Sequence, residues 1–388
     1  MGYRFAASLG MTHRASSIRE TLRLAFAILG LLVGPAVAVE RVHYIAADEV
    51  VWDFAPSYPN NPITGEAFGK EELEFLRQSK DRIGRKYLKA VYREYTDASF
   101  TTLKAKGAAD EHQGLLGPII HAEVGDTITV VFRNNTKLPV GIHPHGVFYA
   151  KASEGAHYAI DASSSDREKG RAMPETGAHV APKGQYTYHW EVPERAGPGP
   201  SDPSSLVWLY HAHDHEGVDI YAGLVGAIVV TRSGAAKPDG TPKDVDRELV
   251  TLFMIFEENM SPYLDANIQR FMGSPKAVNK KDAEFKESNK KHSINGFLYG
   301  NLDGLTMRRG ERVRWYLIGL GNETDIHTAR WHGNTALRRG SRTDTVELFP
   351  ATTEVVDMRP DNVGAWLFHC HVTDHMAGGM VTRYLVTE

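Results

Sequence analysis

The sequence predicts an all-β protein built from two tandem β-sandwich domains. Segments rich in β-branched and aromatic residues recur along the chain, and only short helical patches such as 70–78 interrupt them. Histidine pairs fall at corresponding places in the two halves, once midway and once late in each half. This correspondence indicates an internal duplication, and 388 residues are enough for two domains with substantial cores.

The first 38 residues have the features of a signal peptide. Several arginines precede an apolar run, Leu24–Val33, which is followed by the small-residue cleavage pattern Ala36-Val37-Ala38. The apolar run is too short for a comfortable membrane span, although a retained anchor is the alternative. We therefore expect residues 1–38 to direct export to a periplasm or out of the cell, with no membrane attachment after cleavage.

Strand-like segments fill both halves of the chain after this leader. They are Asp126–Arg133, Gln185–Val192, Leu206–His211 and Gly223–Val230 in the first half, and Glu311–Ile318, Ala365–His371 and Met380–Val386 in the second. A stretch rich in glycine and proline separates the two sets. We therefore predict a first domain at 39–233, a linker at 234–246 and a second domain at 247–388.

Charge and cysteine content narrow the function. The chain has 44 Lys and Arg against 48 Asp and Glu, a balance that gives no indication of a nucleic-acid partner. An exported protein can form disulfides, but a single cysteine cannot form one within the chain. A lone thiol in such a protein fits a metal ligand better than a structural crosslink.

The single cysteine, Cys370, lies in the most informative segment. Side chains alternate between the faces of a β-strand, so His369 and His371 point to one side and Cys370 to the other. Cys370, His375 and Met380 supply a thiolate, an imidazole and a weak thioether, which are three of the four ligands of a blue-copper site. One strand can therefore hold a mononuclear copper on one face and donate two imidazoles to a different metal on the other.

Two further H-x-H motifs occur in the first half, His143-Pro144-His145 and His211-Ala212-His213. In each, the two imidazoles face the same way if the strand is extended, and two such pairs can converge on one metal cluster. Ala212 stands where the second half has Cys370. Without a thiolate the first domain cannot build the blue site and keeps only its paired imidazoles.

A third motif, Asp325–Gly333, contributes two histidines from the second half. His327 would complete the blue site as its second imidazole. His332 would face the metal cluster instead.

These motifs resemble those of the multicopper oxidases, specifically the ceruloplasmin and hephaestin branch. The resemblance runs from Arg41 to the C-terminus and includes Val51–Ala55, Glu111–Pro118, Val192–Gly199, Ile294–Gly300 and Trp315–His327. It implies cupredoxin-like Greek-key β-sandwich domains with copper as the cofactor. It also implies one-electron oxidation of a reductant at a type 1 copper and reduction of O2 to water at a copper cluster.

Carried onto this sequence, the resemblance assigns most copper ligands. The type 1 copper would take His327, Cys370, His375 and Met380. The type 3 copper pair would take His145, His211, His213, His332, His369 and His371. The type 2 copper would take His143 and one more imidazole.

That last imidazole is missing, because Arg330 occupies the central position of the pattern His-x-x-His-x-His. A guanidinium has no lone pair to offer and stays charged. Three outcomes are open. His215 takes over as the ligand, the type 2 copper is held weakly by His143 and water, or the type 2 position stays empty.

The resemblance also bears on assembly and on the electron donor. A cluster that needs ligands from both domain types must lie between them, and a two-domain chain can achieve this as a homotrimer with head-to-tail contacts. The implied reductant is a metal ion, Fe(II) or Cu(I), with phenols as an alternative. Asp374, beside His375, and Glu154, which would approach from a neighbouring subunit, are the candidate residues for binding the reductant.

Two other functions remain open. A blue-copper electron-transfer or copper-binding protein that does not reduce O2 is consistent with Arg330. Copper nitrite reductase also has two such domains in a trimer, but it needs one three-histidine copper, and the H-x-H pairs here exceed that need.

Overall fold

A computed structural model describes residues 38–156 and 177–388 of the chain. The predicted signal peptide, 1–38, lies outside the described residues except for its last residue. None of the described helices is long and apolar enough to cross a membrane.

Two mixed sheets form from the first half of the chain. One has the strand order β2-β1-β4-β7-β6, and the other has the order β3-β9-β8-β5. Their bounds are β1 Glu40–Asp53, β2 Lys86–Tyr95, β3 Ile119–Glu123, β4 Thr127–Asn134, β5 His143–Pro144, β6 Phe148–Tyr149, β7 Gln185–Glu191, β8 Ser205–His211 and β9 Val225–Thr231. Apolar side chains that alternate along these strands form a shared core between the two sheets.

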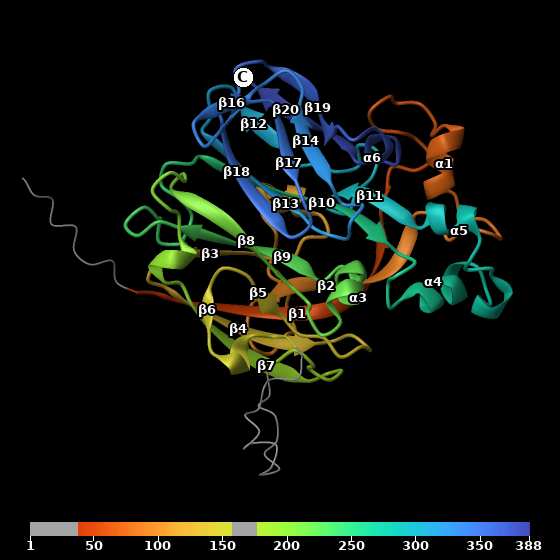
Figure 1. Ribbon diagram of the computed structural model, residues 1–388, viewed down its shortest axis with the longest axis horizontal. Coiled ribbons are helices and arrows are strands. Elements are labelled where there is room, and N and C mark those ends of the chain that lie inside the picture. The colour runs from red at the N-terminus through yellow and green to blue at the C-terminus, as the bar shows by residue number, and fades with distance from the viewer. Residues whose placement is uncertain (1–37, 157–176) are drawn as a thin grey trace, which may run out of the picture. The chain divides into compact units, whose positions relative to one another are not determined.

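Two more sheets form from the second half (Figure 1). Their orders are β11-β10-β13-β18-β15-β16 and β12-β20-β19-β14-β17. The bounds are β10 Arg247–Glu257, β11 Lys290–Ile294, β12 Thr306–Arg308, β13 Val313–Gly319, β14 His327–Trp331, β15 Ala336–Arg338, β16 Ser341–Thr343, β17 Thr345–Leu348, β18 Thr352–Met358, β19 Gly364–Cys370 and β20 Val381–Thr387. Their core contains Trp315, Trp331, Phe368 and, at one end, Cys370 and Met380.

The sheets confirm the predicted all-β architecture and its duplication. In each half the first long strand pairs in parallel with a later one, β1 with β4 and β10 with β13. In each half a glycine with positive φ after the middle histidines packs against a tryptophan of a later strand, Gly146 against Trp208 and Gly333 against Trp366. The domain boundary at 234–246 stays a prediction, although no strand of either pair of sheets crosses it.

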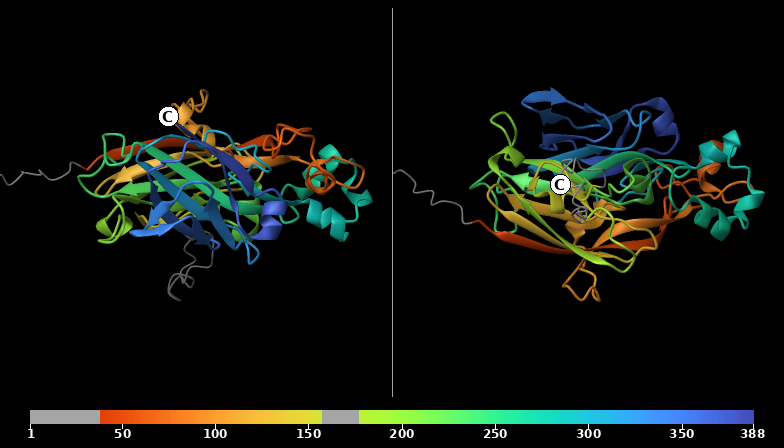
Figure 2. Two further views of the ribbon diagram at one scale, coloured as in Figure 1. Left: turned by 90° about the horizontal axis from the view of Figure 1, so that it is seen from above. Right: turned by 60° about the horizontal axis from the view of Figure 1, so that its bottom comes forward.

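The helices of the described residues are short, as predicted. They are α1 Lys70–Leu76, α3 Glu216–Asp219, α4 Leu264–Phe271, α5 Ala283–Ser288 and α6 Thr373–Ala377, with 3-10 turns η1 Ala108–Gln113, η2 Lys151–Ser153, η3 Glu194–Ala196, η4 Ile220–Ala222 and η5 Pro275–Ala277. Helices α1, α4 and α5 gather at one end in every view (Figures 1 and 2). A hydrogen bond of 3.0 Å from Arg82 to Glu284 joins segments of the two halves there.

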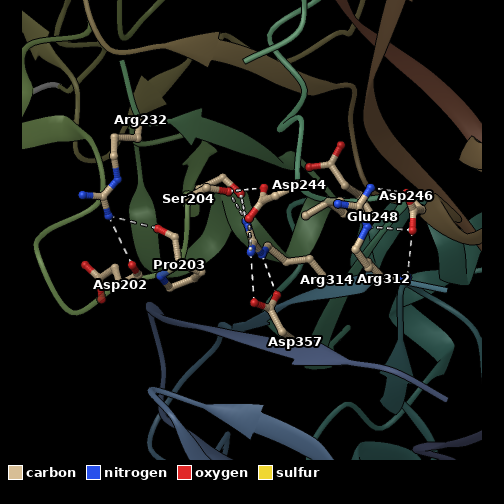
Figure 3. A network of polar contacts seen from close by, with 12 residues as sticks. Asp202, Pro203, Ser204, Arg232, Asp244, Asp246, Glu248, Arg312, Arg314 and Asp357 are labelled. Atoms are coloured by element: carbon tan, nitrogen blue, oxygen red, sulfur yellow. Dashed lines mark hydrogen bonds and ion pairs between the residues drawn. The ribbon is translucent and has the colours of Figure 1, made fainter. Parts of the chain in front are cut away.

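A buried arginine ties the two halves together near the predicted linker (Figure 3). Arg314 on β13 makes a two-pronged contact with Asp357, at 2.7 and 3.0 Å, and donates to the hydroxyls of Ser204 and Ser205, both at 2.7 Å. A guanidinium suits this site because its planar fork matches a carboxylate and still leaves donors for other groups.

A second buried group of charges lies where β2, β10 and β11 meet. Lys89 and Glu258 form an ion pair in which both side chains are fully buried. Lys291, also buried, donates to the carbonyl oxygens of Phe75 and Ser288, each at 2.6 Å. Burial lowers the pKa of Lys291 to about 7, because an ammonium loses hydration there.

Candidate metal centre

The pairing of β14 with β19 sorts the predicted ligands onto two faces of one sheet. Ala329 lies opposite Cys370, and Arg330 lies opposite His369. Cross-strand partners share a face, and successive residues alternate faces. His327 therefore shares the core face with Cys370, whereas Arg330 shares the opposite face with His369.

Three predicted type 1 ligands meet on the core face. The Nδ1 atoms of His327 and His375 are 3.1 Å apart, and the sulfur of Cys370 lies 3.7 Å from Nδ1 of His375 and 3.9 Å from Nδ1 of His327. Among the described residues, no other three His, Cys, Asp or Glu side chains bring their ligand atoms within 4.8 Å of one another. Such separations suit one ion with bonds of about 2.0–2.3 Å, so the donor set fits a copper ion.

The surroundings of Cys370 favour the deprotonated thiolate form of its side chain. Burial by itself raises its pKa, but hydrogen bonds involving His327, His375 and the backbone N–H of Thr328 outweigh burial and lower the pKa to about 6. The thiolate is the form that binds metals. Met380 is fully buried in the same core, and its carbonyl accepts a hydrogen bond of 3.0 Å from the Cys370 N–H.

His375 lies in the short helix α6. This single helical turn brings its ring back over the end of β19. The ring of a further histidine, His292 on β11, lies 5.4 Å from that of His375. No described residue forms a hydrogen bond with the buried Nδ1 of His292, and burial lowers the pKa of this histidine to about 3.

Asp325 is a second residue that the sequence reasoning did not select. Its side chain is fully buried, and Oδ1 lies 3.2 Å from Nε2 of His327. Burial acts to lower the pKa of His327, but its contacts with Asp325 and Cys370 outweigh this and raise it. The only sequence signal for Asp325 is an acid two residues before a ligand, and for His292 it is one histidine in an otherwise ordinary strand.

The four histidines of the two H-x-H motifs in the first half form one group. His143 lies opposite His211 across β5 and β8. Nε2 of His145 is 3.0 Å from Nε2 of His211, and the ring centres of His143 and His213 are 4.8 Å apart. Burial lowers the pKa of His145 to about 4 and that of His211 to about 3. Neutral imidazoles have the free lone pair that a metal requires.

The second half presents a matching group on the face opposite Cys370. Nε2 of His332 lies 2.9 Å from Nε2 of His369, and the rings of His369 and His371 are 5.4 Å apart. Burial lowers the pKa of His369, while His371 is exposed. Each group therefore has two Nε2 atoms about as close as two ligands of one ion.

Several described contacts of the two groups lie within their own halves. Those described for His145 and His211 run to residues of the first half, and those for His332, His369 and His371 run to residues of the second.

Arg330 lies on the same face as His369, but its side chain is directed toward β17. Its Nη2 is 3.2 Å from Oδ2 of Asp344, and Nη1 donates to Thr345 at 3.5 Å. The guanidinium thus has a carboxylate partner and is 32% exposed. It offers no metal ligand.

The remaining candidate residues lie around these groups. His215 is 73% exposed, and its Nδ1 lies 3.4 Å from the carboxylate of Asp214, the residue after His213. The carboxylate of Glu154 pairs with Lys151, while its carbonyl lies 2.6 Å from Nδ1 of His143. Asp374 is exposed in the first turn of α6, beside His375.

Comparisons with known proteins indicate the family of the chain. Two family models, both described as Multicopper oxidase, match residues 94–234 and 272–388. Ceruloplasmin of Homo sapiens is 44% identical over 352 residues, which cover 90% of this chain and 32% of ceruloplasmin. A ferroxidase of Mus musculus is 43% identical over 361 residues, which cover 92% of this chain and 30% of that protein. The chain thus spans about a third of the length of these relatives.

A solved structure of a multicopper oxidase, mgLAC, superposes with a TM-score of 0.55 at 21% identity and covers 90% of this chain and 86% of its own. At that identity the likeness concerns the fold, and it confirms the predicted cupredoxin-like architecture. Together with the matched family models, the type 1 geometry on β14, β19 and α6 leads to one conclusion. The chain belongs to the multicopper oxidase family, whose members bind copper.

Proposed function

We propose that this chain is an oxidase that takes single electrons from a small reductant and passes them to O2. The observation that supports this most is the arrangement around Cys370. A buried thiol and two imidazoles meet on one face of β19, and imidazoles of the same strand point to the other face. Copper would supply the one-electron chemistry and the binding of O2.

The covalent bonds of the chain itself would provide the electron-transfer path from the type 1 copper to the copper cluster. His327, Cys370, His375 and Met380 would hold the type 1 copper. His369 and His371 are covalent neighbours of Cys370, so a path of a few covalent bonds would connect the thiolate to the cluster ligands. The buried, low-pKa thiol keeps this path in its thiolate form.

The cluster would assemble between subunits of a homotrimer. His145, His211 and His213 of one subunit would share the type 3 pair with His332, His369 and His371 of the next. His143 would hold the type 2 copper weakly with water, or that position would stay empty. The position of His215 does not favour it as the substitute ligand, because its ring is exposed and its Nδ1 faces the carboxylate of Asp214.

Fe(II), Cu(I) and phenols are the candidate reductants, and the ferroxidase among the relatives favours a metal ion. Asp374 is the better placed of the two candidate acids, because it is exposed beside His375 and Glu154 is engaged by Lys151. We expect Asp374→Asn to raise KM for Fe(II) about tenfold, the size of one lost charge-assisted contact, and to leave KM for a phenol unchanged. An equal change for both reductants would contradict a role in metal-ion binding.

Oxygen consumption with each reductant tests the oxidase itself. The native protein should consume O2 and show a blue absorption, and Cys370→Ser should lose both, because a hydroxyl cannot replace the thiolate.

Export is tested separately, by sequencing the N-terminus of the mature protein. The mature N-terminus should follow residue 38 if the leader is cleaved there.

A blue-copper electron-transfer protein is the second candidate, and Arg330 favours it. Such a protein would keep the blue absorption and consume no O2. Copper nitrite reductase would instead reduce nitrite and need only one copper beside the blue one.

A further inference from the structure

A buried carboxylate lies directly behind one predicted copper ligand. Oδ1 of Asp325 is 3.2 Å from Nε2 of His327, and the side chains of both residues are fully buried. The other ring nitrogen, Nδ1, faces His375 and Cys370. His327 therefore has one nitrogen directed to the proposed copper and the other directed to a carboxylate.

This arrangement differs from that of the other ligand histidines whose second nitrogen has a described partner. Nδ1 of His143, His211 and His369 lies 2.6, 3.0 and 2.9 Å from backbone carbonyl oxygens. A carbonyl fixes the orientation of a ring and carries no net charge. The carboxylate of Asp325 also fixes the orientation of the ring, and in addition it carries a negative charge. Because the site is buried, the electrostatic interaction of this charge with its neighbours is stronger than it would be in water.

The carboxylate is held rigidly in place. Oδ1 also accepts the N–H of Ile255 at 2.7 Å, and Oδ2 accepts the N–H of Asn322 at 2.9 Å. The Asn322 side chain donates to the hydroxyl of Tyr221, from the first half, at 3.0 Å. Two backbone donors stabilise the ionised carboxylate, and the link to Tyr221 anchors the loop that carries it.

We propose that Asp325 is a positioning residue for the type 1 copper. It holds His327 with the proton on Nε2 and the lone pair on Nδ1, and its charge favours the oxidised, more positive metal ion. This inference rests on the proposed function, because it requires copper at His327, Cys370 and His375. Asp325 thereby sets how readily the site accepts an electron from the reductant.

The test is a redox titration of the blue absorption in the copper-loaded full chain. Asp325→Asn keeps an oxygen for the ring and removes the charge. We expect the equilibrium between reduced and oxidised copper to move about tenfold toward the reduced form, the difference between a charged and a neutral hydrogen-bond partner, which equals 59 mV for a one-electron couple. An unchanged midpoint in a blue Asp325→Asn protein would overturn the proposal.

Two control variants separate charge from structure. Tyr221→Phe removes the anchor of Asn322 but leaves the charge, so it should lower Tm slightly without moving the midpoint. Asp374→Asn removes an exposed charge beside His375, which water screens, and should move the midpoint much less than Asp325→Asn. A shift as large in either control would contradict a specific effect of Asp325.

A measurement on the native sequence covers the case in which Asp325→Asn does not fold. Nitrogen-15 NMR of the reduced, diamagnetic protein should show His327 protonated at Nε2, with a slowly exchanging proton. Protonation at Nδ1 instead would overturn the proposal. Failure of the proposed function is distinct, because the native protein would then either show no blue absorption or show it without consuming O2.

Discussion

Arg330 is the residue at which this chain departs most clearly from the ligand pattern of its family. It lies opposite His369 on the cluster face, and Asp344 and Thr345 hold its guanidinium toward β17. A permanent cation near bound copper ions repels them. The ion pair reduces this repulsion without supplying the missing lone pair.

Replacing Arg330 by histidine should complete the cluster. We expect Arg330→His to bind about one more copper per chain, since a second imidazole joins His143, and to add a type 2 signal in electron paramagnetic resonance. Arg330→Gln is the matched control, because it removes the charge without adding an imidazole. An Arg330→His protein with the copper content of the Arg330→Gln protein would contradict this assignment.

At the scale of elements, the alternation of side chains along the strands predicted on which face of the sheet the main candidate ligands lie. Alternation along β19 placed Cys370 and His369 on opposite faces, and the sheet register agrees. Helix α6 was not foreseen, because five residues are too few to show a helical period. Asp325 and His292 could not be selected either. Their roles depend on the approach of β10, β11 and α6, which one isolated residue in a sequence does not reveal.

Lys291 on strand β11 should make the stability of the fold depend on pH. Burial lowers the pKa of Lys291 from 10.5 to about 7. Between these values the unfolded chain binds a proton that the folded chain does not, so stability rises with pH, by up to about 1.4 kcal/mol per unit. Lys291→Met should flatten this rise in Tm between about pH 7 and 9. Lys286→Met, at an exposed lysine, should keep the native slope, and an unaltered slope in Lys291→Met would refute the assignment.

At the scale of the whole molecule, two histidine groups sit in one chain without described contacts from one group to the other. The sequence identified both groups. If the groups meet between two chains, as we propose, the sequence could not show it, because residues of different chains have no separation along one sequence. The proposed head-to-tail assembly would explain why a chain keeps two incomplete halves.

Mixing two defective chains tests this assembly. His145→Ala breaks the first-half group and His332→Ala breaks the second, so each variant alone should consume no O2. Coexpressed in equal amounts, they should recover about a quarter of the native rate, because random head-to-tail pairing joins two intact halves at that frequency. Light scattering should give the mass of a trimer. A copper-loaded monomer, or no recovery on mixing, would contradict the shared cluster.

The most direct test of the account is the copper content of the purified, reconstituted chain, measured together with its electron paramagnetic resonance spectrum. The account predicts about three coppers per chain, one blue and two in a coupled pair without a signal. About four coppers with a type 2 signal would retain the oxidase and mean that the type 2 position is filled, either by His143 with water or by His143 with His215. A single blue copper per chain would contradict the central claim and leave an electron-transfer protein.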